Sequence, residues 1–379
     1  MKIGVLTYYG DLNCGTNLQA YATYMAVKTI FPNDHVEVIP IHTFISKSKF
    51  RKYCPFITWF FYHTMEAKYK IFKQVNLNVT NDIVIKDVKK ALDFVASQNY
   101  DKIYIGADTL LELDRLPQNY DGLSLYWLKD IKAQKYLLAA SSKNVEFENL
   151  TAKQKADITI AANQFSGIAV RDRATSRLFT KIIDNNKKIE YISDPTFTLN
   201  IDYNITEQYL KRKGITIPEK AVLIHATMSE KWPKRIVKKL HLLGYKIFTP
   251  RFNTWSDCCL NDMSPLEQLG VYKYFKFVIT HRFHDSVFCM KNHTPVMVYV
   301  VNKKAMMTKD GDSKHVSILK DFNLYPDAFL GCSQDSNFMN FNLEEKINNM
   351  TKAFNPILID EKIEEKSKNY MQYLESTKY

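Results

Sequence analysis

The sequence predicts an α/β protein with two parallel β-sheets, one in each of two domains. Short apolar runs rich in valine and isoleucine alternate with helical stretches along the chain. These runs are apolar almost throughout, which is typical of strands buried on both faces of a parallel sheet. The alternation restarts after residue 220, and 379 residues suffice for two domains with sizeable cores. We therefore expect two successive α/β domains.

The first predicted domain, residues 1–204, contains five apolar runs separated by helical patterns. Its expected strands are 2–6 (KIGVL), 36–41 (VEVIPI), 101–107 (DKIYIGA), 135–141 (KYLLAAS) and 167–172 (GIAVRD). Its expected helices are 17–30, 85–96 and 151–165. Polar residues and prolines between 193 and 220 suit a linker, and we place the domain boundary within it.

The second predicted domain, residues 205–355, repeats the alternation. Its expected strands are 221–228 (AVLIHATM), 245–252 (YKIFTPRF), 275–283 (FKFVITHRF) and 294–301 (TPVMVYVV), with helices at 234–244 and 266–275. The charged pattern of residues 356–379 predicts a closing C-terminal helix. The two domains thus share one architecture.

About half of the net charge of +12 lies in residues 47–73. This segment has seven Lys or Arg residues against the single acid Glu66, with nine aromatic residues between them. Such a composition fits peripheral contact with an anionic membrane, or an amphipathic helix that packs its aromatic residues on the core. A nucleic-acid arm uses the same residue types, but we expect no nucleic-acid partner, because the positive charge is concentrated in this one segment.

The chain shows no signal-peptide pattern at its start and no run of about 18 apolar residues, so we expect a cytoplasmic protein, possible peripheral membrane contact aside. We also expect no bound metal. The only close histidine pair, His281 and His284, flanks Arg282, which repels a cation.

Polar residues follow the predicted strands of the first domain, where open parallel sheets bind ligands. Asp11, Asn13 and Asn17 lie in a glycine-containing stretch after the first strand, which lacks the GxGxxG dinucleotide fingerprint. Asp108 and Arg171 follow the third and fifth strands. The two acids also have structural alternatives: Asp11 holding its loop and Asp108 capping a helix.

A denser polar cluster follows two strands of the second domain. His225 follows the first, while His281, Arg282 and His284 lie between an apolar run and a helical stretch. A helix N-terminus there attracts anions, Arg282 can clamp a phosphate or carboxylate, and His284 can exchange a proton near neutral pH. Two structural alternatives stay open: a histidine that caps the helix or bonds the backbone, and an ion pair between Asp285 and Arg282.

Four stretches, in order along residues 1–330, resemble the polysaccharide pyruvyl transferase family: GDLNCGTNLQAYA, GIAVRDRAT, SDPTFTL and VITHRFHDSVFCMKNHTPVM. The most specific element is the triplet Arg282, Phe283 and His284, followed by a helix and a Thr-Pro pair. The chain departs from the family at Asp285, where glycine is usual.

The resemblance implies two Rossmann-like domains with parallel sheets facing a cleft, similar to the GT-B glycosyltransferase architecture. It implies transfer of the pyruvyl group of phosphoenolpyruvate onto a sugar of a bacterial surface polysaccharide precursor, forming a pyruvate ketal. Phosphoenolpyruvate is then a co-substrate and no other cofactor is expected, while the glycan acceptor is expected on a lipid carrier. The alternative is a GT-B nucleotide-sugar glycosyltransferase of polysaccharide synthesis, because fold alone does not fix the donor.

Residue roles follow from the resemblance and from the strand-end positions. The resemblance implies that Arg171 and Arg282 bind the donor and that His284 is the general acid. We add the remaining candidates from their positions: Phe283, His281 and His225 at the donor, Asp11 and Asp108 as alternative bases, and Asn13 and Asn17 at the acceptor.

Overall fold

The computed structural model describes residues 1–42, 55–113, 122–143, 145–184, 186–227, 230–302 and 313–378. The chain forms two compact units. The first unit comprises Met1–Cys54, Lys70–Leu199 and Lys366–Tyr379, and the second comprises Pro55–Tyr69 and Asn200–Glu365. The division thus falls a few residues before 204, where the sequence had placed it. The second unit also takes in residues 55–69, which the sequence had assigned to the first domain.

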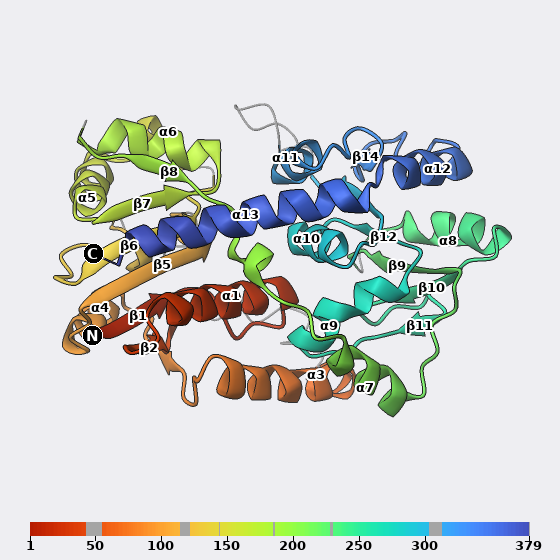
Figure 1. Ribbon diagram of the computed structural model, residues 1–379, viewed down its shortest axis with the longest axis horizontal. Helices are drawn as coiled ribbons and strands as arrows, with labels where there is room; N and C mark the ends of the chain where they lie inside the picture. The colour runs from red at the N-terminus through yellow and green to blue at the C-terminus, as the bar shows by residue number, and fades with distance from the viewer. Residues whose placement is uncertain are drawn as a thin grey trace. The chain divides into compact units, whose positions relative to one another are not determined.

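In the first unit the described strands form a parallel sheet in the order β2-β1-β5-β6-β7-β8 (Figure 1). These strands are β1 (Lys2–Leu6), β2 (His35–Val38), β5 (Lys102–Asp108), β6 (Gln134–Ala140), β7 (Gly167–Val170) and β8 (Ile189–Tyr191). A separate parallel pair joins β3 (Ile41–His42) to β4 (Ile83–Val84). The helices are α1 (Cys14–Ile30), α4 (Val88–Ser97), α5 (Ala152–Asn163) and α6 (Arg173–Ile182).

In the second unit the described strands form another parallel sheet, in the order β11-β10-β9-β12-β13-β14. These strands are β9 (Ala221–His225), β10 (Lys246–Thr249), β11 (Cys258–Cys259), β12 (Phe277–Thr280), β13 (Val296–Val300) and β14 (Phe329–Cys332). Its helices are α7 (Tyr203–Lys213), α8 (Pro233–Leu242), α9 (Pro265–Val271), α10 (Phe283–Lys291), α11 (Lys314–Asp321) and α12 (Leu343–Ala353). Two further helices, α3 (Pro55–Asn76) and α13 (Pro356–Ser376), contribute residues to both units.

Central strands of both sheets are buried over most of their length, as their apolar sequences predict. Every residue of β9, β12 and β13 is buried. With helices on either side, such strands face the core on both faces, so polar side chains concentrate where the strands end. The alternation of strand and helix therefore places the polar residues named above at sheet edges.

The predicted linker, residues 193–220, contains a helix that the sequence analysis did not predict. Helix α7 begins after Asp202, whose side chain accepts from the amide of Asn204, and ends at Gly214 with a left-handed φ of 62°. Its only buried side chains are those of Thr206, Tyr209 and Leu210. So narrow an apolar stripe in a polar sequence gives a weak helical signal.

The basic, aromatic segment 47–73 is helical in its described part, where α3 begins at Pro55. The side chains of Met65, Tyr69 and Phe72 are buried, and Lys68 Nζ lies 2.7 Å from Glu267 Oε2. These contacts agree with the packing alternative for the end of the segment, whereas residues 47–54 lie outside the described residues. Within the described chain, no helix combines the length and the apolar character needed to cross a bilayer.

Candidate functional site

The polar cluster of the second unit lies at the carboxyl edge of its sheet. β9 and β12 pair in parallel with His225 opposite Thr280, so both strands end side by side. His281 and Arg282 follow at once, and Arg282 is the extended residue that precedes the first turn of α10. The cluster therefore combines a strand-end position with the amides of a helix N-terminus, which together favour an anionic ligand.

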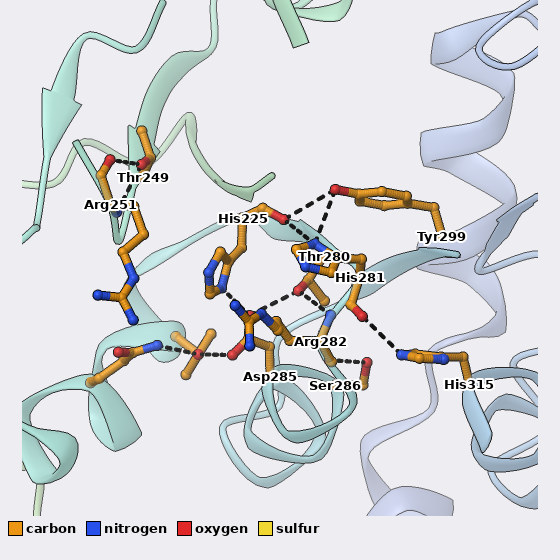
Figure 2. A network of polar contacts seen from close by, with 12 residues as sticks. His225, Thr249, Arg251, Thr280, His281, Arg282, Asp285, Ser286, Tyr299 and His315 are labelled. Carbon is orange, nitrogen blue, oxygen red and sulfur yellow. Dashed lines mark hydrogen bonds and ion pairs between the residues drawn. The ribbon is translucent and has the colours of Figure 1, made fainter. Parts of the chain in front are cut away.

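His225 and Asp285 form a buried pair at this edge (Figure 2). His225 Nδ1 lies 2.6 Å from Asp285 Oδ2, which also accepts from Thr280 Oγ1 at 2.8 Å. The other carboxylate oxygen, Oδ1, accepts from the hydroxyl of Tyr272 at 2.9 Å. Among the described residues Asp285 thus hydrogen-bonds to His225 and forms no ion pair with Arg282, so the alternative of a direct Asp285–Arg282 pair is wrong.

The charges of this pair follow from its surroundings. Burial opposes ionisation of Asp285, but His225 and the hydrogen bond from Thr280 outweigh it and hold the pKa of the carboxyl below its usual range. Burial lowers the pKa of His225 more than Asp285 raises it, and Arg282 and Arg251 lower it further. Asp285 is therefore the charged partner at neutral pH, and a neutral His225 donates its Nδ1 proton to it.

His281 anchors the same edge through a second set of contacts. Its Nδ1 lies 3.1 Å from both the carbonyl oxygen of His225 and the hydroxyl of Tyr299, which donates to Glu230 at 2.9 Å. His315 Nε2 donates to the carbonyl of His281 at 2.8 Å. Burial is the main cause that lowers the pKa of His281 to about 4, and the charge of Arg282 adds to it. These contacts give His281 a structural role in holding the strand end.

The triplet Arg282–Phe283–His284 lies at the N-terminus of α10. The backbone amide of Arg282 donates to Thr280 Oγ1 at 3.0 Å. Within the described chain, the buried Nε atom of the Arg282 side chain has no hydrogen-bond partner. The half-buried His284 ring stacks on Phe288 at 6.2 Å and meets the edge of Phe283 at 5.4 Å. Of the predicted donor and acid residues, the second unit therefore brings together His225, His281, Arg282, Phe283 and His284.

Sequence reasoning missed one cation of this edge. Arg251 follows β10, and its amide donates to Thr249 Oγ1 at 3.0 Å. In Figure 2 its guanidinium lies to the left of the His225 ring, and its charge lowers the pKa of His225. The strand-end rule applied to the run 245–252 would have found Arg251. The strand-end rule does not find Tyr299, because this residue lies within the apolar strand β13 and not at its end. It does not find Glu230 either.

The first unit holds Arg171 between two carboxylates. Arg171 Nη1 lies 2.7 Å from Asp194 Oδ2, and Nη2 lies 3.3 Å from Asp108 Oδ1. Burial opposes the charge of Arg171, but Asp194 and Asp108 raise the pKa of the guanidinium above its usual value. Asp194 also caps the short helix η3 (Pro195–Thr198) by accepting from Thr196. The charge of Arg171 is thus already compensated within this unit.

The loop after β1 is held by Asn17. Its side-chain amide donates to the carbonyls of Asp11 at 2.6 Å and Asn13 at 2.9 Å, and its oxygen accepts from the Gly10 amide at 3.1 Å. Gly10 has a φ of +85°, a conformation that favours glycine. Asn17 is fully buried, whereas Asp11 is exposed and Asn13 is half-buried. Asn17 therefore shapes the loop, and Asp11 and Asn13 present its outer surface.

The predicted site residues thus belong to two units. Asp11, Asn13, Asn17, Asp108 and Arg171 lie at strand ends of the first unit, and the donor cluster lies in the second. Among the residues that the structure describes, no group of three or more His, Cys, Asp or Glu side chains is arranged to hold a metal ion. The second-unit edge can bind an anion beside a neutral histidine.

Comparisons with known proteins complete the description. The family model for polysaccharide pyruvyl transferase matches residues 13–302. A sequence comparison with curated proteins finds no match.

Solved structures share the fold at low sequence identity. UDP-GlcNAc 2-epimerase from Neisseria meningitidis bound to UDP-GlcNAc has a TM-score of 0.53 at 9% identity, covering 100% of this chain and 99% of that chain. HepE from Anabaena in complex with UDP and glucose has a TM-score of 0.50 at 11% identity, covering 100% and 98%. These similarities confirm the predicted α/β fold class of two Rossmann-like domains, similar to GT-B enzymes.

Proposed function

The chain belongs to the polysaccharide pyruvyl transferase family, and from this premise we propose that it moves the pyruvyl group of phosphoenolpyruvate onto two hydroxyls of a sugar, forming a ketal. One observation supports this donor most strongly: Arg282 lies at the N-terminus of α10, beside neutral histidines at the carboxyl edge of the second sheet. Phosphoenolpyruvate carries up to three negative charges on few atoms, so such an edge suits it.

In this proposal the donor binds at the second-unit edge. Arg282 forms charge-assisted hydrogen bonds with the phosphate or carboxylate, and the first amides of α10 add donors. His225 and His281 line the same edge, and Phe283 supplies an apolar wall. The role of Arg171 in donor binding stays a prediction, since its guanidinium already forms ion pairs with Asp194 and Asp108.

The chemistry requires an acid, a base and an anion-binding group. His284 donates a proton to the methylene carbon of the donor, which makes C2 electrophilic. Addition of one hydroxyl, loss of phosphate and addition of the second hydroxyl then give the ketal. Arg282 stabilises the charge of the departing phosphate. No electron transfer occurs in this sequence, so it calls for no redox cofactor.

The first experiment tests the donor, the acceptor and the general acid together. Purified protein is incubated with phosphoenolpyruvate and a panel of lipid-linked and p-nitrophenyl galactosides, with phosphate release and product mass as readouts. We expect acceptor-dependent phosphate release and a pyruvyl mass gain, both lost in His284→Ala. If nucleotide sugars stabilise the protein against heat and phosphoenolpyruvate does not, the protein is instead a nucleotide-sugar glycosyltransferase.

We also propose that the acceptor is carried on a membrane lipid, and that the basic end of segment 47–73 docks on anionic membrane. Changing its basic residues to glutamine should lower binding to vesicles that contain anionic lipid, without altering activity on a short soluble acceptor. Unchanged vesicle binding would refute this docking. The residues to change are Lys47, Lys49, Arg51 and Lys52.

A further inference from the structure

We propose that His225, oriented by Asp285, takes the proton of the first attacking sugar hydroxyl and passes it to the departing phosphate. This inference rests on the proposed function and assigns it a proton carrier that the sequence had sought in Asp11 or Asp108. His225 would be a catalytic residue, and Asp285 a positioning residue that acts through it.

The geometry of the pair is the first support. His225 Nδ1 lies 2.6 Å from Asp285 Oδ2, so the carboxylate fixes the ring and leaves Nε2 as the reactive nitrogen. Asp285 is itself held by Thr280 at 2.8 Å and by Tyr272 at 2.9 Å, and Tyr272 accepts from Gln268 at 3.2 Å. Each residue in this series of hydrogen bonds fixes the orientation of the next, as the network that orients a base requires.

The position of the pair is the second support. His225 ends β9 at the carboxyl edge where parallel sheets bind ligands. Arg282 and Arg251 follow the two strands that flank β9 in the sheet. A phosphate bound by these arginines would therefore lie beside the imidazole. A base that must return its proton to phosphate needs this proximity.

The protonation state is the third support. Burial, partly offset by Asp285, lowers the pKa of His225, and Arg282 and Arg251 lower it further. His281, whose ring centre lies 5.7 Å from that of His225, is also neutral near pH 7. His225 thus starts the reaction as a neutral base, and Asp285 stabilises the imidazolium that forms.

With this assignment, every proton in the reaction has a donor and an acceptor. The proton from His284 forms the new C–H bond at the donor methylene. The first hydroxyl loses its proton to His225 Nε2 as its oxygen bonds to C2. The bond from C2 to the phosphate oxygen then breaks, and the phosphate takes the proton from Nε2. The second hydroxyl adds to C2, and its proton restores His284. Phosphoenolpyruvate and a diol thus yield the ketal and hydrogen phosphate.

The main experiment compares His225→Asn with the wild type. The asparagine amide can still donate to Asp285 but has no counterpart of Nε2, so we expect kcat to fall by about 10²–10⁴-fold. The thermal stabilisation by phosphoenolpyruvate should persist, which also shows that the variant folds. The matched control is His241→Asn, because His241 forms an exposed pair with Asp257 at 3.0 Å in the same unit. Its kcat should match the wild type.

Two further readouts separate positioning from simple structural support. Asp285→Asn should lower kcat about 10²-fold or more with little change in the KM for phosphoenolpyruvate. The double variant should lose little beyond His225→Asn alone, because the two residues act as a unit. In the wild type kcat should fall toward acidic pH as His225 gains a proton, which the charge of Asp285 favours and the charges of Arg282 and Arg251 oppose. That acidic limb should be absent from His225→Asn.

Nitrogen-15 NMR of the histidine rings tests the protonation state of His225 in the wild type directly, without a rate measurement. We expect the His225 signals, assigned by their loss in His225→Asn, to show a proton on Nδ1 and a lone pair on Nε2 at neutral pH. The opposite tautomer would overturn the inference. Full activity of His225→Asn beside an active wild type would also overturn it and leave the proposed function intact. A wild type that releases no phosphate with any acceptor would overturn the proposed function itself.

Discussion

The carboxyl edges of the two sheets carry similar residue types in opposite electrostatic arrangements. In the first unit, Arg171 lies between Asp194 and Asp108, and its charge is compensated. In the second unit, no described carboxylate lies within ion-pair distance of Arg282, and Asp285 is engaged by His225. The charge of a strand-end arginine is therefore compensated by carboxylates in one unit, and in the other it has no carboxylate partner among the described residues. Sequence position alone does not separate these two roles.

The largest effect is expected from a change of Arg282, the arginine without a described carboxylate partner. Arg282→Met should lower kcat/KM for phosphoenolpyruvate by about 10³-fold, since a group that binds the developing phosphate charge contributes about 4 kcal/mol. Its free energy of unfolding should change by about 1 kcal/mol or less. Initial rates and urea denaturation measure the two quantities. The control is Arg235→Met, an exposed arginine on α8. Equal losses in both variants would mean that Arg282 has no special role.

The second prediction concerns the compensated arginine. Arg171→Met leaves Asp194 and Asp108 buried or half-buried without their cation, so we expect a loss of about 3 kcal/mol in the free energy of unfolding. Urea denaturation measures it, with Arg173→Met, on the first turn of α6, as the control. A stable Arg171→Met variant with a raised KM for phosphoenolpyruvate would reverse the comparison and place Arg171 at the donor.

Much of the fold could be predicted from sequence because parallel strands leave apolar runs of recognisable length. The weakly patterned α7 could not, since only a narrow stripe of it is buried. At the site, the strand-end rule located His225, His281 and Arg282, but it did not supply their partners. Asp285 belongs to the same short segment as Arg282, yet it bonds to a strand 60 residues away. Such pairing depends on strand order, which local sequence does not encode.

The third prediction uses the half-buried His281 and the buried His315 of the second-unit edge. Burial is the main cause that lowers the pKa of His281 to about 4 and of His315 to about 3. The unfolded chain therefore binds more protons below about pH 6.5, and stability should fall as pH decreases, by up to about 1.4 kcal/mol per unit for each histidine. His315→Gln, which keeps a donor for the His281 carbonyl, should flatten the dependence between pH 6.5 and 4.5 in urea denaturation. An unchanged slope would contradict the assignment.

The smallest expected effect separates two asparagines of the first-unit edge that the sequence placed together at the acceptor. Asn17→Ala removes three hydrogen bonds to the loop after β1, and leaves the backbone groups of Gly10, Asp11 and Asn13 to find other partners. We expect a loss of about 1–2 kcal/mol in the free energy of unfolding. Asn13→Ala should leave stability within about 0.5 kcal/mol of the wild type, because this side chain is half-buried at the loop surface. If Asn13 binds the acceptor, its variant raises the KM for the sugar alone. A stability loss in Asn13→Ala equal to that of Asn17→Ala would show instead that both asparagines hold the loop, and that this edge of the first unit, like Arg171, is closed by its own contacts.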